Sequence, residues 1–127
     1  MNALDNIAKV NARDCFVEGD SVVFVVPEEQ MHQAIGKNGA TIEMVRKRIG
    51  KRVELFEYSP EPEKFFARAF FNAKLEKTEI KKFGEKKVAI ISADAENKKI
   101  ILQNLRRLKR IKEIAKRNYE IEEVRIR

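Results

Sequence analysis

One short segment, Ala34 to Gly39, combines residue types that can bind a chain of phosphates. Gly36 and Gly39 bracket Lys37 and Asn38 in a Gly-x-x-Gly arrangement. Because glycine has no Cβ and readily adopts positive φ, glycines at this spacing let a sugar-phosphate backbone approach the main chain closely. Lys37 adds a mobile positive charge, and Asn38 adds a hydrogen-bonding group that leaves access open. The expected chemistry is noncovalent binding of a nucleic-acid strand.

The residues that follow the loop favour the same chemistry. A helix is expected to begin after Gly39, and the N–H groups of Ala40, Thr41 and Ile42 at its start would face the phosphates with the helix dipole assisting. A run of cations comes next: Arg46, Lys47, Arg48, Lys51 and Arg52. The alternative interpretation is a tight turn between two helices that uses glycine for geometry alone.

Hydrophobic spacing predicts the elements that position this loop. In the first half the prediction is a helix over Met1–Val10, strands at 15–17 and 22–26, a helix from Pro27 that is cut short by Gly36, a helix from Gly39 to a C-cap at Gly50, and a strand at 52–56. In the second half it is a helix at 63–72 with an aromatic core cluster, strands at 75–83 and 88–91, helices at 95–103 and 106–117, and a strand at 121–126.

The two halves therefore repeat one order of elements: helix, two strands, two helices, strand. An offset of 66 residues places Ile42 on Leu108 and Val45 on Ile111, which indicates an internal duplication. The Pro-containing segment at 58–62 is the expected boundary, giving domains 1–58 and 59–127. Because units of about 60 residues are marginally stable alone, we expect the two to pack together.

Composition narrows the class of protein. The 127 residues include 27 Lys or Arg and 20 Asp or Glu, a net charge of +7, with one Cys and one His. This excess of positive charge favours an acidic partner. One Cys and one His exclude an internal disulfide and make a zinc site improbable, and no catalytic triad or carboxylate cluster is visible, so we expect no cofactor, no metal and no enzymatic activity. Without a transmembrane run or signal-peptide pattern, the expected location is the cytoplasm.

The hairpin, the Pro-Glu-Glu helix start, the Gly-Lys-Asn-Gly loop, the basic helix and the strand resemble a KH domain, in the type II arrangement. More narrowly, the chain is similar to the archaeal NusA family, transcription factors with tandem KH domains. The residues that carry this resemblance are 12–15, 23–26, 34–39, 59–66 and 115–124. It implies an α+β fold with two packed KH domains, each a small three-stranded sheet covered by helices.

The resemblance also implies a function. A KH loop holds about four nucleotides of single-stranded RNA, so the chain is expected to bind nascent RNA near RNA polymerase and to act, as a monomer, in transcription elongation or termination. The apolar floor of a KH groove would include Ile35 and Val53, which are equally suited to the core. The second candidate function is a protein-docking module of RNA polymerase or the ribosome whose RNA contact is incidental.

The second half departs from the pattern at its loop. The positions equivalent to the two glycines hold Leu102 and Leu105. Leucine cannot offer the same open backbone, so this loop is expected to be degenerate, its leucines extending a helix or filling the core. The flanks are strongly basic, and Arg106, Arg107 and Lys109 are candidates for electrostatic attachment of RNA. The alternative for that run is a solvated helix face.

Overall fold

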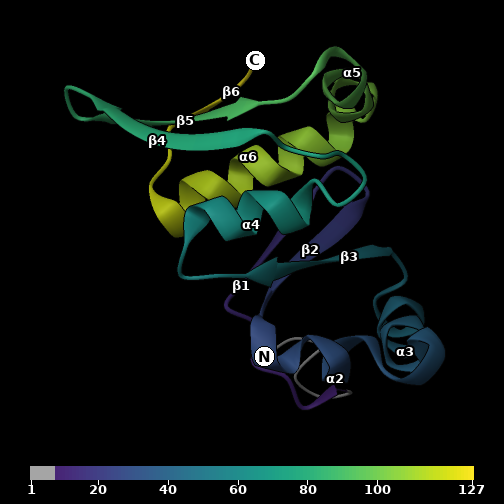
Figure 1. The fold of residues 1–127 in the computed structure, drawn as a ribbon. Helices are drawn as coiled ribbons and strands as arrows, with labels where there is room; N and C mark the ends of the chain where they lie inside the picture. The colour runs from purple at the N-terminus through teal and green to yellow at the C-terminus, as the bar shows by residue number, and fades with distance from the viewer. Residues whose placement is uncertain (1–7) are drawn as a thin grey trace. The chain divides into compact units, whose positions relative to one another are not determined.

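The computed structural model describes residues 8–127, and most of the helix expected over Met1–Val10 lies outside them. The chain forms two compact units, Met1–Ser59 and Pro60–Arg127. Each unit is an α+β layer of one three-stranded mixed sheet with helices packed on it (Figure 1). The α+β class predicted from the sequence is confirmed.

The sheet of the first unit has the order β1-β2-β3. Strands β1 (Asp14–Glu18) and β2 (Ser21–Pro27) form the predicted antiparallel hairpin, and β3 (Arg52–Tyr58) pairs with β2 in parallel. The chain between β2 and β3 forms η1 (Glu28–Gln30), α2 (Met31–Ile35), η2 (Lys37–Gly39) and α3 (Ala40–Ile49). A parallel pair needs such a crossover, and here the crossover carries the Gly-Lys-Asn-Gly loop.

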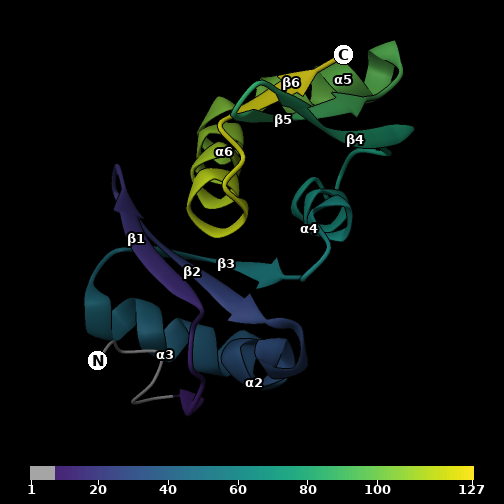
Figure 2. The same ribbon diagram turned by 90° about the vertical axis from the view of Figure 1, so that its left-hand side faces the viewer.

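The core of the first unit lies between the sheet and its helices, which cover one face of the sheet (Figure 2). Alternate residues of β2 point to that face, so Val22, Phe24 and Val26 pack with Ala34 and Val45. Each fully buried Val or Phe side chain contributes about 1.5–3 kcal/mol. This packing fixes α2 and α3 against the sheet and so sets the position of the loop that joins them.

The second unit repeats this topology. Its elements are α4 (Pro62–Ala69), β4 (Lys77–Phe83), β5 (Lys86–Ser92), α5 (Ala95–Gln103), α6 (Leu105–Tyr119) and β6 (Glu123–Ile126). Strand β5 pairs antiparallel with β4 and parallel with β6, as β2 does with β1 and β3. The repeated strand order and crossover support the internal duplication inferred from the sequence.

Most element boundaries agree with the sequence, and the differences have local causes. Helix α4 ends at Ala69, three residues before the predicted end, because Phe70 leaves helical geometry with ψ of 51°. Helix α6 runs on to Tyr119 and stops where Glu120 adopts a left-handed conformation with φ of 58°. The aromatic residues of α4 are core as predicted: the rings of Phe65 and Tyr119 have centroids 5.2 Å apart.

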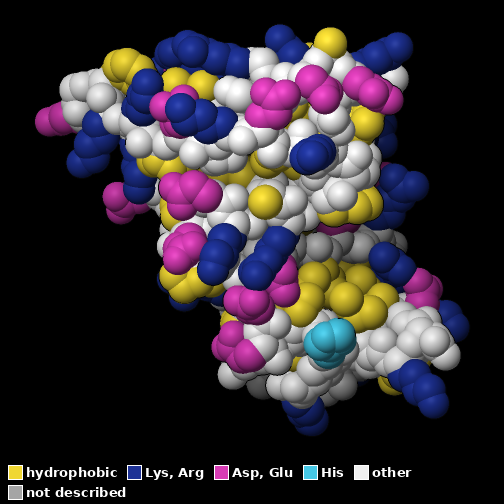
Figure 3. All heavy atoms as spheres, in the orientation of Figure 1, with side chains coloured by type: hydrophobic (Ala, Val, Ile, Leu, Met, Phe, Trp, Pro, Cys, Tyr) yellow, Lys and Arg dark blue, Asp and Glu magenta, His cyan; other side chains and the backbone are white. Residues whose placement is uncertain are grey.

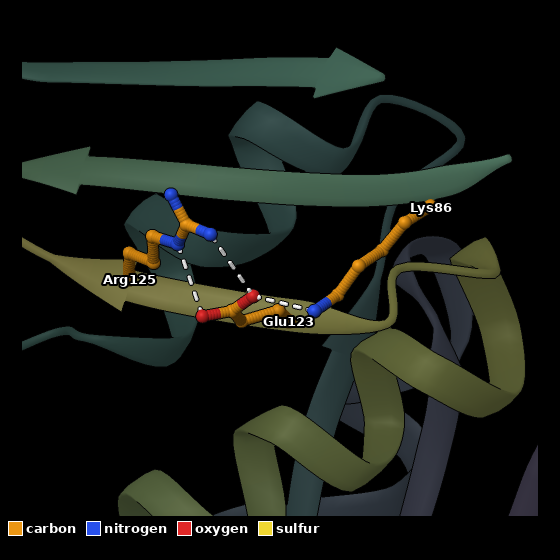
Figure 4. Close-up of polar contacts among 3 residues, drawn as sticks. All are labelled: Lys86, Glu123 and Arg125. Carbon is orange, nitrogen blue, oxygen red and sulfur yellow. Dashed lines mark hydrogen bonds and ion pairs between the residues drawn. The ribbon is translucent and has the colours of Figure 1, made fainter. Parts of the chain in front are cut away.

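An ion-pair network fastens the short strand β6 (Figure 4). Glu123 accepts hydrogen bonds from Arg125 Nε at 3.0 Å and from Arg125 Nη2 at 3.3 Å, and it pairs with Lys86 Nζ at 2.9 Å. The Arg125 hydrogen bonds, followed by those from Lys86, lower the pKa of the Glu123 carboxyl to about 2. Because these groups are exposed, the network adds only modestly to stability.

This network predicts a pH-dependent contribution to stability. A carboxylate whose pKa is lowered on folding stabilises the protein above its unfolded value near 4.5, and that contribution disappears as the pH falls toward 2. We therefore expect Glu123→Gln to lower the thermal midpoint at pH 7 and to have progressively less effect below pH 4.5. Circular dichroism melting between pH 2 and 7 would measure this, with Glu122→Gln as the control, and a difference independent of pH would contradict it.

Candidate nucleic-acid interface

The Gly-Lys-Asn-Gly loop has a backbone path that ordinary residues rarely follow. Gly36 has φ of 77°, Asn38 has φ of 55° and Gly39 has φ of 76°. Glycine takes such angles without penalty, and asparagine tolerates the left-handed region better than most residues. The Gly39 N–H donates to Gly36 O at 3.2 Å, which closes the turn. The loop is therefore a defined left-handed bend between α2 and α3.

The two glycines have different roles. A Cβ built on Gly36 would lie 2.2 Å from Thr41 Oγ1 and 2.7 Å from the Thr41 backbone nitrogen. A Cβ on Gly39 would meet only Ile42 Cγ2, at 3.9 Å. Gly36 is thus required by the chain itself, because Thr41 packs where its side chain would be. Gly39 faces open space and leaves the main chain accessible.

The surface of the loop is accessible along its length. Lys37, Asn38 and Ala40 are exposed, and Gly36 and Gly39 are half-buried. Neither glycine lies sealed beneath another part of its unit. The loop is therefore open enough for a nucleic-acid strand to reach its backbone. The alternative interpretation, in which glycine serves only the geometry of the turn, explains Gly36 fully but explains Gly39 only in part.

The start of α3 has backbone N–H groups next to this loop. Its N-cap is Gly39, which has no side chain to cap them. The Ala40 N–H donates to Lys37 O, so this group serves the turn instead of pointing to a ligand as the sequence suggested. The Thr41 side chain lies beside Gly36. Of the binding groups expected here, those of Lys37 and Asn38 are the most exposed.

The cations of α3 lie at its C-terminal end, about 10–14 Å along the helix from the loop at 1.5 Å per residue. Arg46 pairs with Glu43 through Nη1 and donates from Nη2 to Val53 O at 3.3 Å, so its guanidinium is held between α3 and β3. Lys47 and Arg48 are exposed. The helix therefore combines one fixed cation with mobile ones beyond the loop.

Apolar side chains lie between α2, α3 and β3, and Figure 3 shows them as a yellow area in that region of the first unit. Ile35 is 38% exposed and fits the predicted floor of a groove. Val53 does not, because it is 2% exposed and belongs to the core. Leu55 and Ile42 are partly buried against that core. Leu55 was missed in the sequence, although strand alternation places it on the same face as Val53.

A pocket among the described residues of the first unit lies away from the loop. It lies beside the C-terminal end of α3 and is lined by Asp20, Arg46, Gly50, Lys51, Arg52, Val53 and Glu54. Its charges are mixed, and it includes neither Gly36 nor Gly39. We assign the candidate interface to the loop, because the accessible backbone and the apolar side chains are there.

The equivalent turn of the second unit is built differently. Helix α5 continues through Leu102, and α6 begins at Leu105, so only Asn104 interrupts them. Asn104 has φ of −113°, and its Oδ1 accepts a hydrogen bond from the Arg107 N–H at 3.1 Å, which caps α6. No positive φ is needed here, so leucine fits. The leucines extend the helices, and because both are exposed they do not fill the core.

The predicted cations of the second unit are in different situations. Arg106 and Lys109 are exposed on α6. Arg107 is held in place, because its Nε donates to Ala69 O at 3.0 Å and its guanidinium lies 4.9 Å from the centre of the Phe71 ring. Arg110 is buried. The basic surface of α6 is therefore narrower than the sequence suggests.

Other kinds of site find no support among the described residues. Within residues 8–127, no three His, Cys, Asp or Glu side chains come together as a set of metal ligands. None of the helices in this range is long and apolar enough to cross a bilayer. The strand position of Cys15 predicts a buried and inert thiol, and this prediction is wrong, because Cys15 is exposed.

Comparison with known proteins identifies the class. A model of the KH domain family matches residues 3–85, which include the Gly-Lys-Asn-Gly loop, and the chain belongs to this family. The second three-stranded sheet, with the same strand order, is consistent with a second KH-type domain. KH domains bind RNA, and family membership makes this a non-enzymatic protein.

Individual relatives narrow the similarity to archaeal NusA proteins. The chain is 28% identical over 123 residues to the probable transcription termination protein NusA of Methanocaldococcus jannaschii, across 96% of this chain and 67% of the relative. It is 40% identical over 65 residues to that of Halococcus morrhuae, across 51% of this chain and 47% of the relative. A solved structure titled "Crystal structure of APE1850" has a TM-score of 0.88 at 27% identity, covering 98% of this chain and 92% of that one.

The two glycine environments predict different costs of substitution. We expect Gly36→Ala to lower the free energy of unfolding by about 2–4 kcal/mol, because the new Cβ meets both the Thr41 side chain and the backbone. Gly39→Ala should cost about 1 kcal/mol, from the left-handed φ alone. Urea denaturation would measure both. Gly19→Ala is the control, since Gly19 has positive φ and no atom within 4 Å, and equal costs at Gly36 and Gly19 would contradict the packing role of Thr41.

Proposed function

We propose that the chain binds single-stranded RNA through the Gly-Lys-Asn-Gly loop and acts on the nascent transcript in transcription elongation or termination. The observation that carries the proposal is the accessible left-handed bend at Asn38 and Gly39, directly before α3. A sugar-phosphate strand can approach the main chain there, and the Lys37 side chain supplies an adjacent positive charge.

The groups around the loop indicate which side of the bound RNA would face the protein backbone and which would face its apolar side chains. Phosphates would lie at Gly36–Ala40, and bases would turn toward the apolar side chains of Ile35 and Leu55. Beyond them, Lys47 would add charge and the fixed guanidinium of Arg46 would mark one edge of the groove. Phosphate contacts position such a strand, and contacts to bases select its sequence.

The biological setting is inferred from the relatives. The matched archaeal proteins are named as probable transcription termination proteins. Similarity along nearly the whole chain to one of them supports a role beside RNA polymerase, in the cytoplasm where the transcript emerges. The second candidate function, a docking module, is favoured by one specific observation, the exposed leucines at the second turn.

Charge reversal in the loop tests RNA binding. Lys37→Asp with Asn38→Asp places two carboxylates where phosphates are proposed, and aspartate tolerates the left-handed φ of residue 38, so the fold should be retained. We expect affinity for short single-stranded RNA to fall by about tenfold or more, measured by fluorescence anisotropy.

The control carries the same charge change of −3 away from the loop: Lys82→Glu on β4 with Lys64→Gln on α4. Both side chains are exposed. This variant should bind RNA nearly as well as the unaltered chain. If the loop variant retains full affinity, or if the control loses as much, the loop is not the binding site and the docking function is preferred.

Salt dependence tests the role of the second unit. If Arg106 and Lys109 each neutralise one phosphate, Arg106→Gln with Lys109→Gln should reduce the slope of log affinity against log salt by roughly 1.4, since each contact to a single strand contributes roughly 0.7. Affinity measured from low to moderate salt would give the slope. Lys81→Gln with Lys82→Gln is the matched control, and an unchanged slope in the α6 variant would assign RNA binding to the first unit alone.

A further inference from the structure

The turn between α5 and α6 is bordered by apolar side chains that the RNA-binding proposal does not use. Leu102 is 42% exposed, Leu105 is 66% exposed and Phe71, just beyond α4, is 71% exposed. Large apolar side chains so exposed on a strongly charged protein are typical of surfaces that meet another molecule when they lie together. In the first unit, the equivalent positions are the glycines of the loop.

A small pocket lies at this turn. It has a volume of about 130 Å³, and Phe70, Phe71, Ile100, Ile101 and Leu108 form its apolar lining. Asn104, which stands between the two exposed leucines, also lines it. Pockets for small molecules measure about 300–1,000 Å³. The size of this one suits a single apolar side chain.

The pocket is held in shape from several directions. Arg107 lines it, bonds to Ala69 O at 3.0 Å and lies over the Phe71 ring, so it fixes the end of α4 against α6, which lies alongside it (Figure 1). The Lys74 N–H donates to Asn97 Oδ1 at 2.8 Å, which fastens the segment after Phe71 to α5. A site whose walls are already ordered loses less entropy on binding.

The charge of the segment that contains this turn favours an acidic occupant. Residues 97–112 contain seven Lys or Arg and no Asp or Glu. Lys99 and Arg106 are exposed on either side of the turn. Clusters of aromatic and Arg side chains are enriched in protein interfaces, whereas RNA binding by stacking needs open aromatic faces. One side of the Phe71 ring is taken by Arg107, and the neighbouring leucines offer no stacking surface.

We propose that the α5–α6 pocket, together with the exposed Leu102 and Leu105 on either side of Asn104 in the chain, docks an acidic segment of a protein partner. One apolar side chain of that segment enters the pocket, and its flanking carboxylates pair with Lys99 and Arg106. The leucines that replace the two loop glycines then serve as contact surface. The second unit would bind protein at the end where the first unit binds RNA.

The test uses the full chain and a short synthetic peptide of Glu, Asp and Ser with one central Phe. Binding is followed by NMR on the ¹⁵N-labelled protein. We expect the amide signals of Phe71, Asn104 and Leu105 to shift, and replacement of the peptide's Phe by Ser to weaken binding about tenfold. Phe71→Ser and Leu105→Ser in the protein should weaken it by a similar factor.

Phe83→Ser is the matched control, because Phe83 is also exposed and also lies under an arginine, Arg125. It should leave peptide affinity unchanged. Failure of the peptide to shift these signals, or equal losses from Phe83→Ser and Leu105→Ser, would overturn the proposal. A short oligoadenylate that shifts the same signals, with the peptide inactive, would overturn it too and assign the surface to RNA. The proposed RNA-binding loop lies in the first unit, so this test can fail or succeed whatever the charge-reversed loop variant shows.

Discussion

The close approach of Thr41 to Gly36 is the constraint on which the Gly-Lys-Asn-Gly loop of the first unit depends. A Cβ atom on residue 36 would lie 2.2 Å from Thr41 Oγ1, so the turn can close only when this residue is glycine. Closure brings Lys37 and Asn38 out to the surface and leaves Gly39 as the bare N-cap of α3. The loop is therefore set by packing within the chain, and its exposed backbone follows from that packing.

The two units show how the same topology supports two kinds of turn. In the first, three positive φ values direct the chain through a four-residue bend. In the second, Asn104 alone joins α5 to α6 and caps the second helix through its side chain. Helix α6 thus begins with a side-chain cap, whereas α3 begins after a left-handed glycine that has no side chain to cap it. One solution exposes main chain, and the other exposes leucines.

Much of the fold could be predicted from sequence because its signals are local. The run of β-branched and aromatic residues in β2 and the glycine cap of α3 at Gly50 are two such signals, and the 66-residue offset adds the repeated order of elements. The sequence does not show that Val53 is buried in the core while Leu55 is only partly buried. Both lie on one face of β3, and their exposure depends on where α3 packs. The contacts made by Thr41, Ala40 and Arg107 also depend on tertiary geometry, since residue type and spacing do not show which groups these residues contact.

The single-residue turn at Asn104 has a consequence for how the two halves can change over time. A bend that requires glycine at residue 36 and positive φ at residues 38 and 39 accepts fewer replacements without loss of stability. A turn that needs only an N-capping side chain leaves its neighbours open to almost any helix-compatible residue. After a duplication, the corner at Gly36 would therefore keep its residue types by backbone stereochemistry, whereas the corner at Asn104 would be open to a wider range of side chains.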